Sequence, residues 1–350
     1  MVQATKQPDI ASGADANPRA RNGVSAVTLG LRLLNVGPVL ILVLLIAGIS
    51  LLTQNFLKPG NIGNILAQTA VIAIVAIGQH LVILTRGIDL SVGANLALAT
   101  VVGGLVYRWV DSSALVVLAM LASGVLVGFV NGAVYVFGRL PHPFIITLAT
   151  LSICKGLALE LAVNHTTMRG MPGAVTFLGE TSSLGIPNSF FIVAGVALIV
   201  LVLTKSMVWG RWTYAVGGNP KAAVEMGIPV RWVLVVTYVI AGLCAGIGAV
   251  VLAGRTGAGS PLYGNLLELD TIAAVIIGGA SFLGGRGHLG HALVGAVMIG
   301  VIRNALNLLN VDVFYQMIAI GLIIVLAVEA DVLRNHLEAR ARVNQSRAAQ

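Results

Sequence analysis

The chain alternates between long apolar runs and short polar stretches that contain turn residues. Stretches such as "KPGN" at 58–61 and "RLPHP" at 139–143 carry the proline and glycine residues that end helices. A helix needs about 20 apolar residues to cross a bilayer, and the runs are close to that length. The pattern predicts an all-α integral membrane protein with about ten transmembrane helices. The ten segments cover approximately 36–53, 65–84, 91–108, 114–137, 144–163, 190–206, 232–254, 268–283, 290–309 and 312–328.

Composition and charge agree with this class. Hydrophobic residues make up 57% of the 350 positions and charged residues 10%, whereas soluble domains carry about 25% charged residues. The net charge of +8 does not indicate nucleic-acid binding, because the basic residues lie in tails and short loops. With the N-terminal tail taken as cytoplasmic, fifteen of the 21 lysines and arginines fall on the inner side and four on the outer side. The positive-inside rule then places both termini in the cytoplasm.

The domain organisation follows from the same pattern. Residues 1–35 are polar and predict a disordered cytoplasmic tail, 36–335 a transmembrane domain, and 336–350 a second cytoplasmic tail. Glycines 124, 128 and 132 stand four apart, as do Gly242 and Gly246. Such small residues let helices approach closely, either within one subunit or against a second one.

Few residues inside or at the edge of the spans are charged, and each is a candidate for function: Lys155, Glu160, Glu268, Asp270 and Arg303. A charge at the bilayer centre costs roughly 2.5–3.5 kcal/mol on insertion scales, so Lys155 and Arg303 draw attention. Arg303, Asn307 and Asn310 stand at i, i+4 and i+7 of the ninth segment. This stripe could line a path with Lys155, or it could bond to neighbouring helices.

Several kinds of chemistry are missing from the sequence. No lysine stands in a P-loop pattern, so the chain itself cannot hold ATP in that way. Cys154 and Cys244 have no metal or redox spacing, and we expect free thiols. His288 and His291 lack further ligands, so no metal site is predicted. The sequence contains no pair of a nucleophile and a base that would indicate an enzyme.

One polar loop contains a short helix with strong end signals. The loop covers 207–231, and Asn219 is a good N-cap before Pro220, which suits the first helical position. Gly227 can adopt the left-handed conformation that ends a helix. A helix of about two turns is marginal alone, so it must dock on something. Ala222, Ala223 and Met226 give it a small apolar face for a cytoplasmic partner.

Three motifs together resemble one family. The loop sequence "GGNPKAAVEMGIPV" is similar to the cytoplasmic coupling loop of ribose-type monosaccharide permeases of bacterial ATP-binding-cassette (ABC) importers. "LTRGIDLSVGANLAL" at 84–98 and "GGASFLGGRGHLGHALVGA" at 278–296 resemble its two other glycine-rich signatures. One departure is Lys221, where relatives often carry an acidic residue. The resemblance spans roughly 36–335.

The resemblance implies the fold, the partners and the roles of the motif residues. The fold is that of type II ABC importer permeases, with ten spans, in the bacterial inner membrane. The implied partners are a second permease subunit (identical or a paralogue), two cytoplasmic ATP-binding subunits and a periplasmic sugar-binding protein. ATP and Mg²⁺ would bind the ATPase subunit, and this chain would hold no cofactor. The coupling loop would act through Asn219, Pro220, Ala222, Ala223, Glu225, Met226 and Gly227, and the other two motifs would contribute to a gate or to packing through Gly87, Asp89, Ser91, Gly93, Gly278, Gly279, Ser281, Gly284, Gly285, Gly287 and Gly290.

A secondary transporter driven by an ion gradient is the alternative. With Lys155, Glu160 and Asp270 in its path, it would explain the charges inside the spans, but not the capped helix in the loop. The missing P-loop requires an external source of energy, and the capped helix is where an ATPase could bind. We therefore favour the ATP-driven permease.

Overall fold

The structure is a computed structural model that describes residues 37–163, 168–180 and 185–348. The predicted tail at 1–35 lies outside these residues. The chain divides into two units, 38–333 and the two ends 1–37 plus 334–350. Of the second unit the structure describes Gly37 and the helical residues up to 348, so part of the tail predicted at 336–350 is helical. The account below concerns the first unit.

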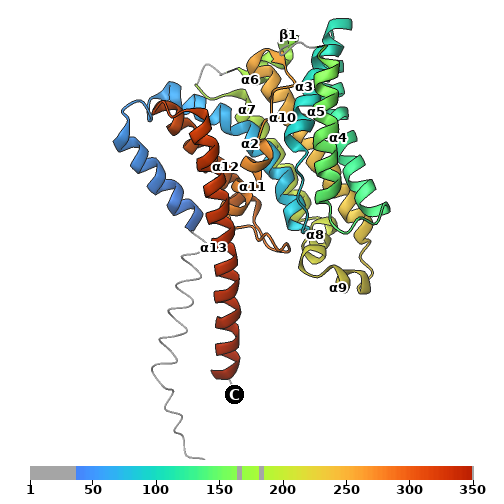
Figure 1. Cartoon of the computed structure of the whole chain (residues 1–350), viewed down its shortest axis with the longest axis vertical. Coiled ribbons are helices and arrows are strands. Elements are labelled where there is room, and N and C mark those ends of the chain that lie inside the picture. Colours follow the sequence, from blue (N-terminus) through green and yellow to red (C-terminus); the bar gives the residue numbers. More distant parts are fainter. Residues whose placement is uncertain (1–36, 164–167, 181–184, 349–350) are drawn as a thin grey trace, which may run out of the picture. The chain divides into compact units, whose positions relative to one another are not determined.

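The described chain is almost entirely helical (Figure 1). A single ladder pairs two short strands antiparallel, with Met168 opposite Gly259. The elements are a first helix Gly37–Leu52, then α2 (Pro59–Leu84), α3 (Val92–Trp109), α4 (Ser113–Phe137), α5 (Phe144–Leu161), β1 (Met168–Arg169), α6 (Gly173–Gly179), α7 (Asn188–Lys205), α8 (Val208–Gly218), α9 (Pro220–Glu225), α10 (Val230–Thr256), β2 (Ala258–Gly259), α11 (Leu267–Ile277), α12 (Leu289–Leu308) and α13 (Val313–Ala348).

Each predicted apolar segment lies on a helix, but they differ in length. Within the described residues, seven helices are long and apolar enough to span a membrane: α2, α4, α5, α7, α10, α12 and α13 up to Leu333. The first helix, α3 and α11 do not meet that criterion. The protein is thus an all-α, multi-pass type of chain, and the count of ten spans stays a prediction.

The eighth predicted segment, 268–283, is longer than the helix that the structure has there. Its helix α11 ends at Ile277, after 11 residues. The next residues form an irregular loop in which Gly279, Gly284 and Gly285 have positive φ. Glycine tolerates this conformation without a steric penalty, and a helix cannot continue through it. The apolar character of "GGASFL" had concealed this break.

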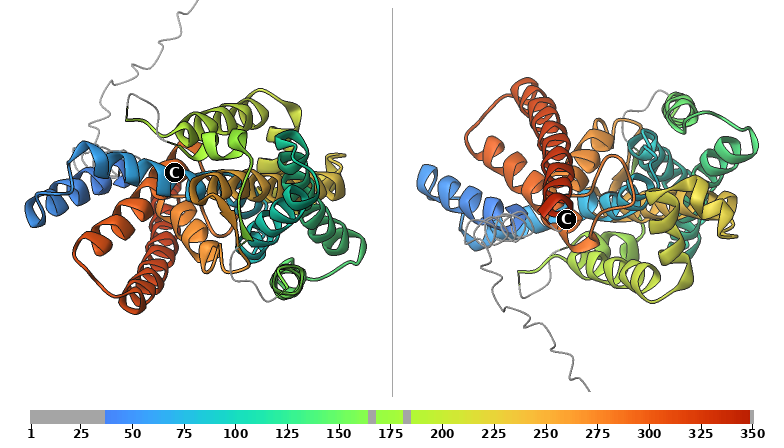
Figure 2. Two further views of the ribbon diagram at one scale, coloured as in Figure 1. Left: turned by 90° about the horizontal axis from the view of Figure 1, so that it is seen from above. Right: turned by 90° about the horizontal axis from the view of Figure 1, so that it is seen from below.

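Helices α2 and α10 form the core of the unit. In the most apolar 18-residue windows, 83% of α2 and 67% of α10 is buried, against 22% of α5 and 17% of α7. Figures 1 and 2 show α10 between α2 and α4, and it packs against both. The outer helices expose large apolar side chains, as expected of surfaces that face lipid.

The small-residue stripe packs within this one chain. A side chain built on Gly124 would collide with the backbone of Gly242 and Gly246, and one on Gly128 with that of Tyr238 and Gly242. The backbones of α4 and α10 are therefore in direct contact. This confirms the interpretation that these glycines join helices of the same subunit.

A non-helical stretch, residues 257–266, returns along α3. In Figure 1, β1 and α6 lie at the upper end of the unit, and α8 and α9 lie at the lower end. From the upper end the stretch passes Thr100, whose hydroxyl accepts a hydrogen bond from Ser260 N (3.2 Å). Further down, Gly264 lies against Gly93 at the start of α3. α11 then continues to the lower end.

The contact between α4 and α10 predicts a large effect of added bulk. Gly128→Leu should force the two backbones apart and cost roughly 1–3 kcal/mol of stability, as overpacking of cores does. Thermal unfolding of the detergent-solubilised protein is measured as the fraction that stays monodisperse on heating. Gly195→Leu is the control, because nothing lies within 4 Å of that position in α7. Equal melting temperatures of both variants would contradict this packing.

Candidate functional site: a junction of three glycine-rich segments

Helix α9 has the ends that the sequence predicts. The side-chain oxygen of Asn219 accepts hydrogen bonds from Lys221 N (3.1 Å) and Ala222 N (3.2 Å), which otherwise lack partners at a helix start. Pro220 occupies the first helical position. Beyond the helix, Gly227 has a φ of 76°. The prediction of a capped short helix is confirmed.

The predicted apolar face of α9 is partly wrong. Ala223 is only 3% exposed, because it packs inward with Val216 and Val233. Its carbonyl also accepts a hydrogen bond from Ile228 N (3.0 Å), which turns the chain back toward α10. Ala222 is half-buried and Glu225 is exposed.

The outward apolar side chains of α9 are Val224, 61% exposed, and Met226, 81% exposed. A helix of six residues needs an anchor in its own chain, and Ala223 provides it. Met226 is therefore the most exposed residue of the predicted face, and Val224 adds a second outward apolar side chain.

The end of α8 joins this hairpin to the other two motifs. Arg86 follows α2 and donates hydrogen bonds to the carbonyls of Gly217 (Nε, 2.6 Å) and Gly218 (2.5 Å). These carbonyls are at the C-terminus of α8, where the helix dipole is negative and attracts a cation. Gly285 N donates to Leu84 O (2.8 Å), so the loop 278–288 reaches the same place. We call this meeting point the junction.

The hydroxyl of Tyr214 gives the junction a further bond, to the carbonyl of Gly287 (2.9 Å). Burial raises the pKa of this phenol. A side chain built on Gly217 would collide with Leu84 O and Gly285 N, and one on Gly284 with Arg86. Close backbone approach thus explains these glycines.

The remaining motif glycines divide into two groups. Gly87 lies against Tyr238, Gly93 against Gly264, and Gly278 against the backbone of His291, so each is at a close contact. A side chain built on Gly290 would have no neighbour within 4 Å, so close packing does not explain a glycine at this position.

A buried hydrogen-bond network follows directly on the junction. Asp89 Oδ1 accepts from the backbone N (2.8 Å) and the hydroxyl (2.6 Å) of Ser91. Asn131 of α4 donates to Ser91 Oγ (2.8 Å) and accepts from Thr150 Oγ1 of α5 (2.7 Å). Burial raises the pKa of the Asp89 carboxyl, against the bonds from Ser91, which lower it. The network ties the loop between α2 and α3 to α4 and α5.

Ser281 belongs to a separate contact. Its hydroxyl bonds to Asp331 Oδ2 of α13 (3.3 Å), which also accepts from Phe282 N (3.2 Å). This attaches the loop 278–288 to α13. No local pattern indicates this pairing, because the partners are 50 residues apart.

The residues predicted to line a polar path make contacts with different elements. Arg303 forms an ion pair with Asp270 of α11 (2.7 Å). Asn307 accepts from Gln316 of α13 (2.9 Å). Asn310 lies beyond the end of α12, with a φ of 54°, so it is not on the predicted helical stripe.

Lys155 stands elsewhere and is exposed. Its Nζ lies 3.3 Å from Asn265 Oδ1. The contacts of Arg303 and Asn307 match the other interpretation of the polar stripe, namely hydrogen bonds and ion pairs with neighbouring helices.

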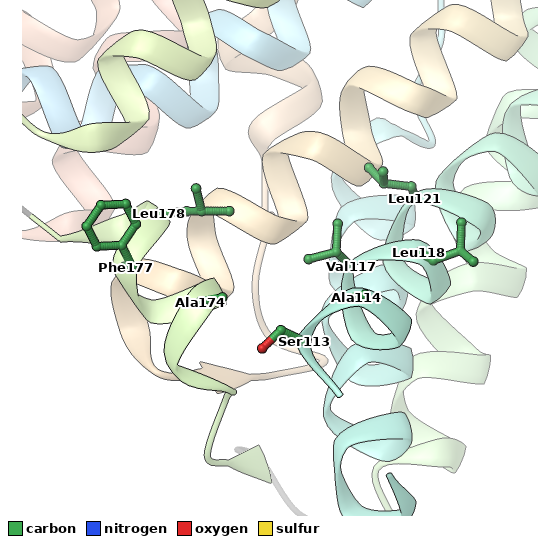
Figure 3. A pocket seen from close by; sticks show the side chains of 8 residues that line it. All are labelled: Ser113, Ala114, Val117, Leu118, Leu121, Ala174, Phe177 and Leu178. Atoms are coloured by element: carbon green, nitrogen blue, oxygen red, sulfur yellow. The ribbon is translucent and has the colours of Figure 1, made fainter. Parts of the chain in front are cut away.

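A metal-binding cluster and the groove between α4 and α6 are the other candidate sites. Among the described residues no group of three His, Cys, Asp or Glu side chains could hold a metal ion. A groove of about 670 Å³ lies between α4 and α6, where Val117 and Leu178 face each other (Figure 3). Of its eight lining residues, only Ser113 carries a polar side chain, so it does not suit a polar solute.

Sequence reasoning missed Arg86, Tyr214, Asn131 and Thr150. In the sequence Arg86 is a cation directly after an apolar segment, a position that indicates only the charge bias of the inner loops. The other three lie outside the three motifs or at neutral positions in a helix, and only the fold brings them to the site.

Comparison with known proteins identifies the class first. The described chain has seven helices long and apolar enough to span a membrane and a capped loop helix at one end. Residues 61–328 match the family of branched-chain amino acid transport system / permease components. The chain belongs to this family.

Relatives with known roles are similar over most of their length. The ribose import permease protein RbsC of Bacillus subtilis is 41% identical over 297 residues, which cover 84% of this chain and 92% of the relative. The D-allose transport system permease protein AlsC of Escherichia coli is 40% identical, covering 81% and 87%. The fructose import permease protein FrcC of Rhizobium meliloti is 36% identical, covering 84% of each. No solved structure matches the chain. The protein is a transporter subunit, and in such systems the ATPase is a separate chain.

The buried network predicts a cost for removing its central amide. Asn131→Leu should remove the bond that Ser91 Oγ accepts and the bond from Thr150 Oγ1 to Asn131, and destabilise the protein by roughly 1–3 kcal/mol. The measurement is again the melting temperature in detergent. Asn64→Leu, on the exposed side of α2, is the matched control. A melting temperature of Asn131→Leu equal to that of the control would show that the network is not stabilising.

Proposed function

We propose that this chain is the permease subunit of an ATP-driven importer that carries a monosaccharide from the periplasm to the cytoplasm. The observation that carries the proposal is the junction, which connects an exposed, capped helix to both other motifs through direct hydrogen bonds. The names of the relatives, which are permeases for ribose, D-allose and fructose, support a monosaccharide.

The proposed assembly has two permease subunits, identical or paralogous. Two cytoplasmic ATPase subunits would bind ATP and Mg²⁺, and a periplasmic binding protein would deliver the sugar. The proposal further includes the ten-span fold of type II importers, a place in the bacterial inner membrane and both termini in the cytoplasm. The charge bias of the loops supports this orientation.

Docking of the ATPase would use the outward side of α9. Val224 and Met226 are two exposed apolar side chains on a rigidly held turn. Methionine adapts to irregular surfaces, which suits a contact that must persist while the partner moves. Lys221 and Glu225 are also exposed, and they offer both charges at the rim. An acidic contact at position 221 is therefore not part of this proposal.

Movement of α9 would reach the membrane helices through Arg86. Its guanidinium holds the end of α8, and its backbone belongs to the loop that leads to Asp89. Charge-assisted hydrogen bonds of this kind are stronger than neutral ones and directional. The network around Asp89 then extends to α4 and α5.

The rival, a transporter driven by an ion gradient, loses support from the same contacts. The charges Arg303 and Asp270 pair with each other at 2.7 Å, which accounts for them without a proton or ion relay. The capped helix has no role in such a transporter.

The docking proposal predicts that Met226→Glu weakens the complex. A charge placed in the centre of an apolar contact must be desolvated, which is costly without a partner. We expect loss of ATPase co-purification from membranes, while insertion of the permease is unchanged. Trp109→Glu is the control, because Trp109 is equally exposed, at 86%, but ends α3 near the opposite end. Wild-type recovery of the ATPase with Met226→Glu would refute the docking role.

The transmission proposal predicts uncoupling by Arg86→Met. The variant loses two charge-assisted bonds, each worth about 1.5–3 kcal/mol. The ATPase should still co-purify, but sugar uptake should fall about tenfold or more, since 1.4 kcal/mol corresponds to a factor of ten. Arg86→Lys keeps the charge but not the fork of donors, so its uptake should be intermediate.

Arg139→Met is the matched control for Arg86→Met. Both arginines are exposed and have a positive φ, 66° for Arg86 and 52° for Arg139. Arg139 should tolerate the change. If Arg86→Met transports like the wild type, the path through Arg86 is wrong.

A further inference from the structure

Lys155 lies at a position of α5 where exposure of its charge to lipid would be costly. It is the twelfth of 18 residues of α5, about 16 Å along the helix from Phe144 and about 9 Å from Leu161. Its neighbour Cys154 is buried, whereas Lys155 is exposed. A charged side chain inside a span pairs with protein groups or faces water.

Two polar side chains share this place with Lys155. Asn265 is exposed and accepts from Lys155 Nζ at 3.3 Å. The carboxylate of Glu268 is close enough for electrostatic attraction to Lys155. A cavity of about 30 Å³ is lined by these three residues and Tyr263, among others. That volume accommodates a water molecule or a hydroxyl group, but not a sugar ring.

The backbone beside Lys155 is irregular. Gly264 and Leu266 have positive φ, 67° and 61°. α11 is 11 residues long, about 16 Å, and it separates this stretch from the junction at the lower end. The hydrocarbon core is about 30 Å thick, so the stretch lies near half depth. Non-helical backbone at that depth occurs only inside protein or beside a water-filled cavity.

We propose that Lys155, Asn265 and Glu268 form a contact surface for an uncharged, polyhydroxylated solute in a water-filled path. The inference rests on the proposed function as an importer permease. Lys155 donates hydrogen bonds, Glu268 accepts them and Asn265 does both. The two charges are of opposite sign, which suits neutral hydroxyl groups better than an anion or a cation. The small cavity receives one hydroxyl at a time, so contact is brief.

The first test asks whether the surface faces water. In the full complex in proteoliposomes, with Cys154 and Cys244 replaced by alanine, single cysteines are exposed to a charged methanethiosulfonate reagent. Lys155→Cys and Asn265→Cys should be labelled. Ile153→Cys is the control, because it is 55% exposed but about 200° away from Lys155 around the helix. Labelling of Lys155→Cys no faster than that of Ile153→Cys would overturn the proposal.

The second test asks whether the surface contacts the solute. Uptake of radiolabelled D-ribose, D-allose and D-fructose is measured with Lys155→Met and Glu268→Gln, beside the ATPase activity stimulated by the binding protein. Uptake should fall about tenfold, since each variant loses a charged hydrogen bond, and ATPase stimulation should persist. Lys205→Met, a lysine at the end of α7, is the control. Unchanged uptake in both variants would overturn the proposal.

The two tests separate this inference from the proposed function. If the wild-type complex takes up none of these sugars on addition of ATP, the proposed function fails, while the labelling contrast between positions 155 and 153 still holds. If wild-type uptake is driven by ATP and the labelling contrast is missing, the contact surface alone is wrong.

Discussion

The structure depends on direct contact between backbones, which glycine permits. Gly217 lies against Leu84 and Gly285, Gly93 against Gly264, and Gly124 against Gly242. A single methyl group at these places would meet main-chain atoms, which cannot rotate away as a side chain can. In a lipid-facing body there is little hydrophobic force to hold helices together, so close packing has to supply the association. The glycines are therefore the means by which the helices and loops are joined.

The same contacts allow the chain to break its helices inside the body. An interrupted helix leaves backbone groups that need partners, and in a membrane these partners must be protein groups or water. In the loop after α2 the Asp89 carboxylate accepts from Ser91 N, and Gly285 N donates to Leu84 O at the end of α2. The side chain of Arg86, from the same loop, is the partner of carbonyls at the end of α8. At residues 257–266 Thr100 provides part of the partners. Both breaks lie at the ends of α3 or along it, and this explains why polar side chains concentrate around that helix.

The sequence predicted local features well and spatial ones poorly. The apolar pattern located the helices, and the cap residues located α9 to within one residue, because both signals are contained in a few neighbouring positions. The inward side of Ala223 could not be known, since it depends on Val233 of another helix. The pairing of Arg303 with Asp270 and that of Arg86 with Gly217 join segments 33 and 131 residues apart. The prediction that Asn310 lies on the helical stripe was wrong for a local reason: the periodic pattern continues beyond the point where α12 ends.

The first turn of α3 connects the two polar regions of the molecule. Ser91, just before this helix, bonds to Asp89 beside the junction, and Gly93, two residues further, lies against Gly264 and the carboxylate of Glu268. Asn131 and Thr150 attach the same turn to α4 and α5, the helix that carries Lys155. A displacement of the loop after α2 would therefore change the spacing between α3, Glu268 and Lys155 together. The proposed coupling between an ATPase at α9 and a solute near Lys155 would run through this chain of contacts.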